Sequence, residues 1–385
     1  MHILIIQHRS GLDVPLRSQL AEIFGEYLSK KHKISVITFS DKNRDYMWKG
    51  CYIYEIKFKK NSLKYCFFFP FLLFIKKIRK IISDEKIDLV FGRNVYIISN
   101  LFYPISKILK VPFVLQLTVP VPIGHVIESS YLKSKLLLFI LKITMNMSDL
   151  LLLNYSLGRY IEKLWRVDKT RIFTLHNGVN VKKFNLQFSK LYIKKKYLLI
   201  YVGTLDLRRK LEILIKAMGI VVNKFPTANL LIVGDGTGRE SLMNLTKKLN
   251  LTNNIKFIGR VSYSLIPRYL NSSYIGVCPV PPTIYYKLSS PLKLLEYMGA
   301  GLAIVANEEI IEHKKILEET NGGKLFSFEK EENLANAIID LLSQKEKLKE
   351  MGERNIRWVH TYRDYKHLAN NLEKKLLYVL KNYKN

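Results

Sequence analysis

A serine–proline pair followed by lysine and glutamate gives residues 289–301 the clearest chemical pattern in the sequence. Ser290 is a residue type favoured at a helix N-cap, and Pro291 suits the first helical turn, so a helix is predicted to begin here. The backbone amides of Leu292 and Lys293, together with the lysine charge, would stabilise an anion at that N-terminus. We expect a diphosphate site, and an ordinary capped helix is the alternative.

Glu296 lies about one and a half turns further along the same predicted helix. Its carboxylate is placed to accept hydrogen bonds from the two hydroxyl groups of a ribose while the helix amides hold phosphates. A nucleoside diphosphate has both groups. The other interpretation is a surface glutamate without a ligand.

Three consecutive cations, Arg208, Arg209 and Lys210, follow an apolar run that predicts a strand over residues 197–203. Loops at the carboxyl edge of a doubly wound sheet bind ligands. Arg209 and Lys210 are therefore predicted to neutralise a leaving diphosphate, and a solvated run of charges is the alternative.

Glycines end two of the predicted strands. Gly203 closes the first, and Gly234 and Gly236 follow an apolar run at residues 231–233. The spacing matches no complete dinucleotide-binding pattern. These glycines would either shape a binding site or simply permit tight turns.

Alternating apolar and amphipathic stretches predict two doubly wound α/β domains, each with a mostly parallel sheet. We expect an N-terminal domain over residues 1–180, a charged linker over 181–196 and a second domain over 197–360. Residues 361–385 predict a final helix that would pack back on the N-terminal domain. Its packing face would comprise Leu368, Leu372, Leu376 and Leu380. A single helical region is predicted over 330–357.

The composition excludes several protein classes. The formal charge of +30 favours anionic partners, but without a basic tail or a nucleic-acid module we expect no nucleic-acid binding. Cys51, Cys66 and Cys278 show neither disulfide nor zinc spacing, which favours a reducing compartment. The sequence does not begin with a signal-peptide pattern, and the longest apolar stretch, residues 66–75, is too short to span a bilayer.

The sequence resembles the retaining GT-B glycosyltransferases known as glycosyltransferase family 4. The order and spacing of its motifs agree over nearly the whole chain, and the helix motif before the apolar run 302–306 is the most specific. The matching segments are 88–90, 176–180 with Phe184, 203–210, 234–236, 257–261 and 290–301. The resemblance implies two Rossmann-like domains that face each other across a cleft, with the donor in the second domain and the acceptor in the first.

Residue roles follow from this resemblance. Glu296 would bind the donor ribose, Lys293 and Leu292 the phosphates, and Arg209 with Lys210 the diphosphate. Arg260 and Val261 would hold the base through backbone atoms, although Arg260 has the alternative of a solvated loop residue. The family needs no metal, and the chain lacks an obvious Asp-x-Asp site. We therefore expect no metal and no cofactor, with the nucleotide sugar as co-substrate.

Two departures concern the catalytic centre. The glutamate that many family members carry eight positions before the ribose-binding one is Leu288 here, and the family's histidine after the fifth strand is absent from Gln116-Leu117-Thr118. His125 is a candidate substitute, with a loop histidine without function as the alternative. Topology also places Gly11 and Arg93 at the cleft, although a plain turn and a surface charge would explain them.

The sequence therefore predicts a nucleotide-sugar-dependent hexosyltransferase with a glycan or lipid-linked acceptor, in cell-surface polysaccharide synthesis. Another nucleotide-sugar enzyme, such as an epimerase, and a non-catalytic binder of anionic polymers are the alternatives. Apolar runs flanked by lysines at residues 57–80 and 131–147 predict attachment to an anionic membrane at its cytoplasmic face. Core helices packed on the sheet would explain the same two runs.

Overall fold

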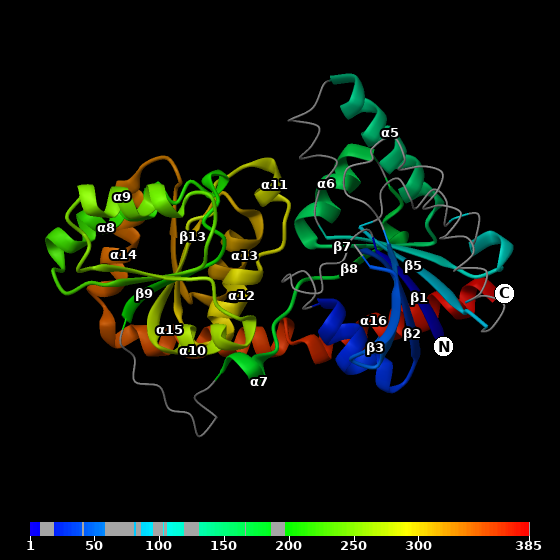
Figure 1. Cartoon of the computed structure of the whole chain (residues 1–385). Coiled ribbons are helices and arrows are strands. Elements are labelled where there is room, and N and C mark those ends of the chain that lie inside the picture. Colours follow the sequence, from blue (N-terminus) through cyan, green and yellow to red (C-terminus); the bar gives the residue numbers. More distant parts are fainter. Residues whose placement is uncertain are drawn as a thin grey trace. The chain divides into compact units, whose positions relative to one another are not determined.

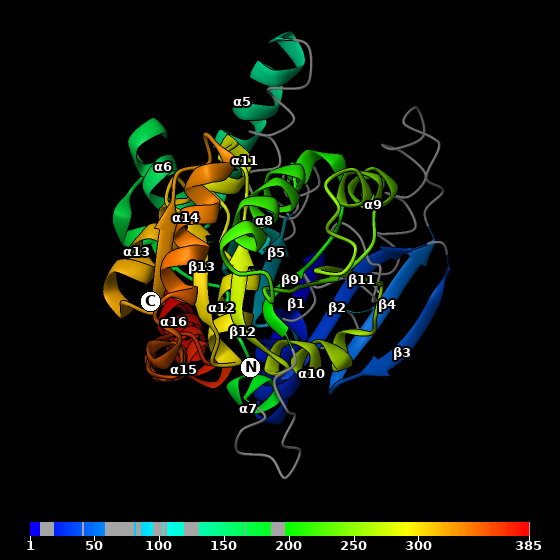
Figure 2. The same ribbon diagram turned by 90° about the vertical axis from the view of Figure 1, so that its left-hand side faces the viewer.

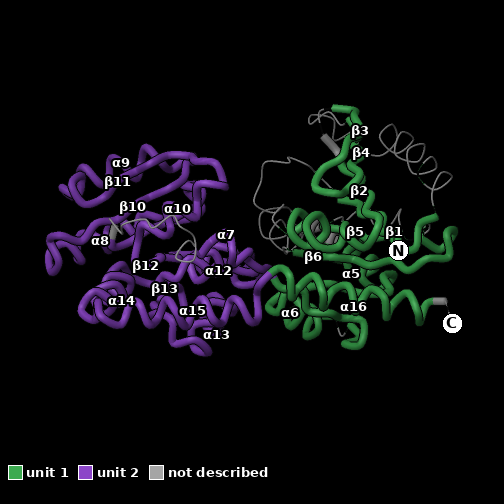
Figure 3. Tube along the Cα trace, turned by 90° about the horizontal axis from the view of Figure 1, so that it is seen from below, with its two compact units in different colours: residues 1–176, 365–385 green, residues 177–364 purple. Residues whose placement is uncertain are grey.

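The computed structural model of the chain, drawn in Figure 1, forms two compact units. Unit 1 comprises residues 1–176 and 365–385, and unit 2 comprises residues 177–364 (Figure 3). The chain therefore divides after His176 and after Asp364. Residues 181–185, predicted as the start of a linker, belong to unit 2, where Val181 and Phe184 are buried in its core. The structure describes residues 1–7, 19–40, 42–57, 81, 86–94, 103, 106–118, 131–165, 167–185 and 197–384.

Unit 1 contains an eight-stranded sheet with the order β3-β4-β2-β1-β5-β6-β7-β8. All neighbouring strands are parallel except β3 and β4, which form an antiparallel edge pair. Strand β3 was not predicted from the sequence. The strands are β1 (His2–Gln7), β2 (Lys33–Ser40), β3 (Arg44–Trp48), β4 (Cys51–Lys57), β5 (Leu89–Arg93), β6 (Phe113–Leu117), β7 (Leu150–Leu153) and β8 (Ile172–Thr174).

Helix α16 (Tyr365–Lys384) packs in unit 1, although unit 2 precedes it in the sequence (Figure 3). The predicted leucine stripe lies in the same buried cluster as Leu20, Ile23 and Phe24 of η1. Burial of this stripe explains why the helix belongs to unit 1. The other helical elements here are η1 (Leu20–Tyr27), η2 (Leu28–Lys30), α5 (Tyr131–Met147), α6 (Tyr155–Trp165) and η4 (Lys169–Arg171).

Unit 2 is built on a six-stranded, fully parallel sheet with the order β11-β10-β9-β12-β13-β14. The chain order reverses between β9 and β12, so the loops after these strands flank the position where doubly wound sheets bind ligands. The strands are β9 (Tyr197–Val202), β10 (Leu230–Val233), β11 (Ile255–Gly259), β12 (Ser273–Cys278), β13 (Ala303–Asn307) and β14 (Gly323–Phe326).

Helices cover both faces of this sheet (Figure 2). One buried cluster joins the sheet to α8, α9, α14 and the first part of α15, and a second joins it to α7, α10, α12, α13 and the last part of α15. The helical elements are α7 (Val181–Phe184), η6 (Leu207–Arg209), α8 (Glu212–Lys224), α9 (Arg239–Lys248), η7 (Tyr263–Leu265), α10 (Ile266–Asn271), α11 (Ile284–Lys287), α12 (Leu292–Gly299), α13 (Ile311–Thr320), α14 (Glu331–Leu342), η8 (Lys345–Lys347) and α15 (Leu348–Tyr362).

The single helical region predicted over 330–357 was wrong. Helix α14 ends at Leu342 and α15 begins at Leu348, with η8 between them. Both helices begin in the same buried cluster, which contains Leu334 and Ile338 of α14 and Leu348 of α15, but α15 continues into the second cluster with Val359.

No helix in the described part of the chain combines the length and the apolar composition that a bilayer span needs. Of the two predicted membrane-facing runs, residues 58–80 lie outside the described residues. The other run forms α5, in which Leu141 and Met145 are buried while Phe139 is 61% exposed. Part of α5 therefore packs as a core helix and part faces solvent.

Candidate functional site

The helix predicted from the serine–proline pair is α12, but its cap differs from the prediction. Pro291 is the N-cap and the helix begins at Leu292. The Ser290 hydroxyl lies 3.1 Å from a carboxylate oxygen of buried Glu312, so it donates to that side chain and does not cap α12. With Pro291 as the N-cap, the first amides of α12, those of Leu292 and Lys293, lie at the helix N-terminus where an anion would bind.

Lys293 reaches from α12 to the end of β9. Its Nζ donates to the Tyr201 hydroxyl at 2.9 Å and lies 4.6 Å from the centre of the Tyr201 ring. Burial, and next the nearby charge of Arg209, lower the pKa of Lys293 to about 7. A Cβ at Gly203 would collide with the lysine side chain, so only glycine at this strand end leaves room for the ammonium group.

Glu296 faces the same region from the next turn of α12. Its side chain is buried, and Oε1 accepts a hydrogen bond of 2.7 Å from the Tyr263 hydroxyl. Burial raises the pKa of the carboxyl to about 7, and the Tyr263 hydrogen bond and the Lys293 charge act in the opposite direction. The structure thus brings together the two α12 side chains that the sequence predicted to bind a nucleotide.

Arg209 and Lys210 occupy different environments. The Arg209 guanidinium stacks on the Tyr286 ring, with Cζ 4.6 Å from the ring centre, and its charge lowers the pKa of Lys293. Lys210 is exposed, with left-handed backbone at φ 49°, and its side chain makes no hydrogen bond or ion pair with the described residues. The predicted pair therefore separates into a cation within the cluster and a solvated one.

The predicted glycines permit neighbouring loops to touch. A Cβ at Gly234 would collide with the Gly203 carbonyl oxygen, and one at Gly236 would lie 2.7 Å from the backbone of Leu205. Backbone hydrogen bonds join the same loops, from Gly203 N to the Val233 carbonyl and from Gly234 N to the Gly259 carbonyl. The glycines hold the strand-end loops of β9, β10 and β11 close together.

The segment predicted to hold the base follows β11. Arg260 is exposed and Val261 is partly buried against the cluster that contains α12. Before the start of α12, the Asn177 side chain donates to the Ser290 carbonyl at 3.2 Å. This bond connects the predicted Asn177-Gly178 motif to the start of α12.

In unit 1, Arg93 is buried and is therefore not the surface charge that was one interpretation of it. Its guanidinium donates to the Gln116 side chain at 3.1 Å and to the Gln19 side chain at 3.4 Å, and Gln116 donates to Gln19 at 2.8 Å. Burial lowers the pKa of Arg93 to about 10, so the charge remains at neutral pH. The other predicted residues of this half, Gly11 and His125, lie outside the described residues.

Three tyrosines of the cluster were not predicted from the sequence. Tyr201, Tyr263 and Tyr286 contact Lys293, Glu296 and Arg209 respectively. Tyr201 lies in the strand that was predicted to end at Gly203. Its position near this strand end was the sequence signal that could have identified it as a site residue. Nothing local marks Tyr263, which lies 33 positions from its partner.

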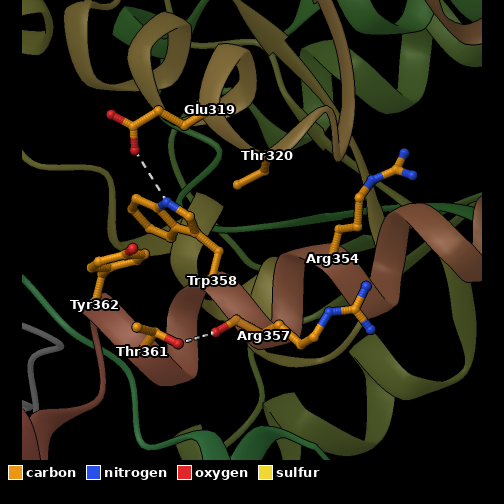
Figure 4. A pocket seen from close by; sticks show the side chains of 7 residues that line it. All are labelled: Glu319, Thr320, Arg354, Arg357, Trp358, Thr361 and Tyr362. Carbon is orange, nitrogen blue, oxygen red and sulfur yellow. Dashed lines mark hydrogen bonds between the residues drawn. The ribbon is translucent and has the colours of Figure 1, made fainter.

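A hollow of about 290 Å³ between α13 and α15 contains none of the predicted residues. Its lining, drawn in Figure 4, includes the guanidinium groups of Arg354 and Arg357 and the indole ring of Trp358. The Trp358 indole donates to the Glu319 carboxylate at 3.1 Å. Because the hollow lacks a helix N-terminus paired with a buried carboxylate, we place the candidate site at α12. The residues that line the hollow between α13 and α15 are Glu319, Thr320, Arg354, Arg357, Trp358, Thr361 and Tyr362.

The arrangement at α12 suits an anion joined to a diol. Two cations and the helix amides are available to phosphates, and a buried carboxylate lies within one turn of them. Among the residues that the structure describes, no three His, Cys, Asp or Glu side chains gather as a metal site would require.

Known sequences that are similar to this chain include glycosyltransferases. Residues 183–358 match the family described as Glycosyl transferases group 1. Spore coat protein SA of Bacillus subtilis is 25% identical over 241 residues, which cover 56% of this chain and 61% of that protein. An uncharacterized glycosyltransferase of Haemophilus influenzae is 32% identical over 123 residues, 30% of this chain and 33% of that protein. The chain thus spans about one third to three fifths of these curated relatives.

Solved structures resemble the chain over almost its whole length. Sucrose-phosphate synthase from Thermosynechococcus elongatus matches with a TM-score of 0.77 at 15% identity, covering 99% of this chain and 100% of that one. HepE from Anabaena, in complex with UDP, matches with a TM-score of 0.73 at 16% identity, covering 98% and 99%. These likenesses confirm the predicted GT-B fold of two Rossmann-like α/β domains with parallel sheets.

Proposed function

We propose that this chain, whose residues 183–358 match the group 1 glycosyl transferases, is a glycosyltransferase that uses a nucleoside-diphosphate sugar. The single observation that carries the proposal is α12, where Lys293 and the first helix amides lie within one turn of the buried Glu296 carboxylate. A nucleoside diphosphate has a matching diphosphate and ribose diol. The matched segment contains all of these residues.

Each residue of the cluster has a distinct proposed role. The amides of Leu292 and Lys293, with the Lys293 ammonium, hold the diphosphate, and Glu296 accepts hydrogen bonds from the ribose. Arg209 neutralises the charge that develops on the leaving diphosphate, which is a preorganised electrostatic contribution. Val261 and Arg260 face the base through their backbone, and no metal or cofactor is required.

The donor to test first is a uridine diphosphate sugar, because HepE has been crystallised with UDP and with UDP-glucose. Transfer of a hexose with retention of the anomeric configuration follows from the resemblance to glycosyltransferase family 4. We propose a glycan or lipid-linked acceptor in cell-surface polysaccharide synthesis. Gly11 and Arg93 remain predictions for the acceptor side, and His125 remains a prediction for the catalytic centre.

We also propose that the enzyme works at the cytoplasmic face of an anionic membrane. The support is the lysine-flanked apolar run at 57–80 and the exposed Phe139 of α5. Co-sedimentation with anionic and neutral vesicles tests this part separately. Equal recovery with both kinds of vesicle contradicts it.

The decisive experiment is a screen of UDP-, GDP- and ADP-sugars with purified chain and a membrane extract as the acceptor source. Release of nucleoside diphosphate together with sugar incorporation supports a transferase. Sugar interconversion without release of nucleoside diphosphate would identify an epimerase. No binding or turnover of any nucleotide sugar would contradict the proposed function.

A further inference from the structure

The hydrogen bond between Tyr263 and Glu296 joins an exposed side chain to a buried one. The Tyr263 hydroxyl lies 2.7 Å from Glu296 Oε1, Tyr263 is 47% exposed, and Glu296 is 7% exposed. Of the described residues, Tyr263 provides the one hydrogen-bond donor to this carboxylate. A buried carboxylate needs such donors, because its charged form has lost its water.

The position of Tyr263 is set by the packing of its ring. It belongs to η7, a short helix that follows the loop after β11. Its ring contacts the buried Phe184 edge-on, with 6.1 Å between ring centres. The ring is therefore held at one side of α12 while its hydroxyl reaches the carboxylate.

This hydrogen bond opposes the effect of burial. Burial raises the pKa of Glu296 to about 7, and the Tyr263 hydrogen bond is the stronger of the two influences that lower it, ahead of the Lys293 charge. Donation to the charged form favours ionisation, so loss of the hydroxyl would raise the pKa further. A carboxylate accepts about four hydrogen bonds, so Oε2 and a lone pair of Oε1 are available beside the tyrosine.

We propose that Tyr263 is a positioning residue of the donor site, whose hydroxyl fixes Oε1 of Glu296 so that the remaining acceptor positions face the ribose. This inference rests on the proposed function, because it assumes that Glu296 meets a ribose. It assigns Tyr263 no contact with the reacting atoms. The tyrosine acts by keeping the carboxylate ionised and oriented at neutral pH.

The test compares Tyr263→Phe with wild type in the affinity for UDP, measured calorimetrically at about pH 6 and about pH 9. Phenylalanine keeps the ring that packs on Phe184. We expect Kd to rise about tenfold at the lower pH, from the loss of one hydrogen bond to a charged group, and about twofold at the higher pH, where Glu296 is ionised in both proteins. Tyr362→Phe, at an exposed position of α15, is the matched control and should equal wild type.

Two results would overturn the inference. An equal rise in Kd at both pH values would mean that Tyr263 is merely structural, and an unchanged Kd would mean that it has no role. Absence of UDP binding by wild type would count against UDP as the donor, and GDP and ADP would then serve as probes at the same two pH values.

A measurement without ligand separates the inference from the proposed function. The ¹³C carboxyl signal of Glu296, assigned by its loss in Glu296→Gln, should titrate at a higher pH in Tyr263→Phe than in wild type or Tyr362→Phe. An unchanged midpoint would contradict the inference even if UDP binds. A raised midpoint in a protein that binds no nucleoside diphosphate would contradict only the proposed function.

Discussion

The carboxyl ends of the two sheets carry arginines in opposite situations. In unit 1, Arg93 is buried and bonded to the amides of Gln19 and Gln116. In unit 2, Arg209 is partly exposed, stacked on Tyr286, and its guanidinium donates to none of the described residues. The first arginine has protein partners for its donors, and the second has donors left for a ligand.

The two arginines therefore differ in their expected roles: Arg93 stabilises the structure of unit 1, and Arg209 is available to bind a ligand. A guanidinium has five N–H donors, and a neutral amide oxygen is a partner that fixes it without cancelling its charge. Such a buried group is costly to disturb, because its removal leaves polar partners unsatisfied. A stacked, partly exposed guanidinium costs less to hold and remains available to a phosphate. We therefore expect changes at the unit 2 cluster to alter ligand binding and changes at Arg93 to alter stability.

The largest effect is expected from Glu296→Ala. Loss of a carboxylate that bridges two ribose hydroxyls removes two charge-assisted hydrogen bonds and should lower donor affinity by about 100-fold or more. Because the pKa of Glu296 is already raised by burial, the free energy of unfolding at neutral pH should fall little. Glu308→Ala, at an exposed glutamate of the same unit, is the control. Normal kinetics in folded Glu296→Ala would remove the assigned donor site.

Arg93→Met should lower stability without changing donor affinity. Removing the guanidinium leaves Gln19 and Gln116 with one partner fewer each and should lower the free energy of unfolding by about 2–4 kcal/mol. Urea unfolding measures this loss, with Arg159→Met at an exposed position of α6 as control. Affinity for UDP should stay unchanged. Lost affinity for UDP with an unchanged free energy of unfolding would contradict the comparison, because it would assign Arg93 to ligand binding and not to stability.

Arg209 and Lys210 should separate in kinetics. Arg209→Ala should lower kcat about tenfold and raise the donor KM less, because a charge on the leaving diphosphate is greatest in the transition state. Lys210→Ala should change both constants less than about twofold, since its side chain is solvated. Equal losses in the two variants would show that the exposed lysine also meets the donor. A pure KM effect of Arg209→Ala would assign it to ground-state binding.

The smallest effect is expected in the pH dependence of UDP affinity. The pKa of Glu296 is raised to about 7 and that of Lys293 is lowered to about 7. Affinity should therefore fall below neutrality as the carboxylate is protonated and fall above neutrality as the ammonium loses its proton, giving a bell shape. Glu296→Gln should flatten the acid limb and Lys293→Arg the alkaline limb. A monotonic profile in wild type would contradict the assignment of both groups.

Local sequence patterns predicted much of the fold and part of the site. Apolar runs and strand-end glycines report on the chain within a few residues, so both sheets and α12 could be predicted. Ser290 was predicted wrongly as a cap because a distant residue, Glu312, takes its hydroxyl. Strand β3 was missed because it is a short edge strand with exposed residues such as Met47. The contact of Tyr263 with Glu296 depends on tertiary packing, which no local pattern reports.

The return of α16 to unit 1 has a consequence for the order of events during synthesis. Its leucines share a buried cluster with η1 and with strands such as β1, so this core stays incomplete until residues 365–380 have left the ribosome. Unit 2 is continuous in sequence and is available to fold first. The usual sequence in which the N-terminal domain folds first is thereby reversed, and the nascent first unit exposes apolar surface for as long as translation of unit 2 lasts.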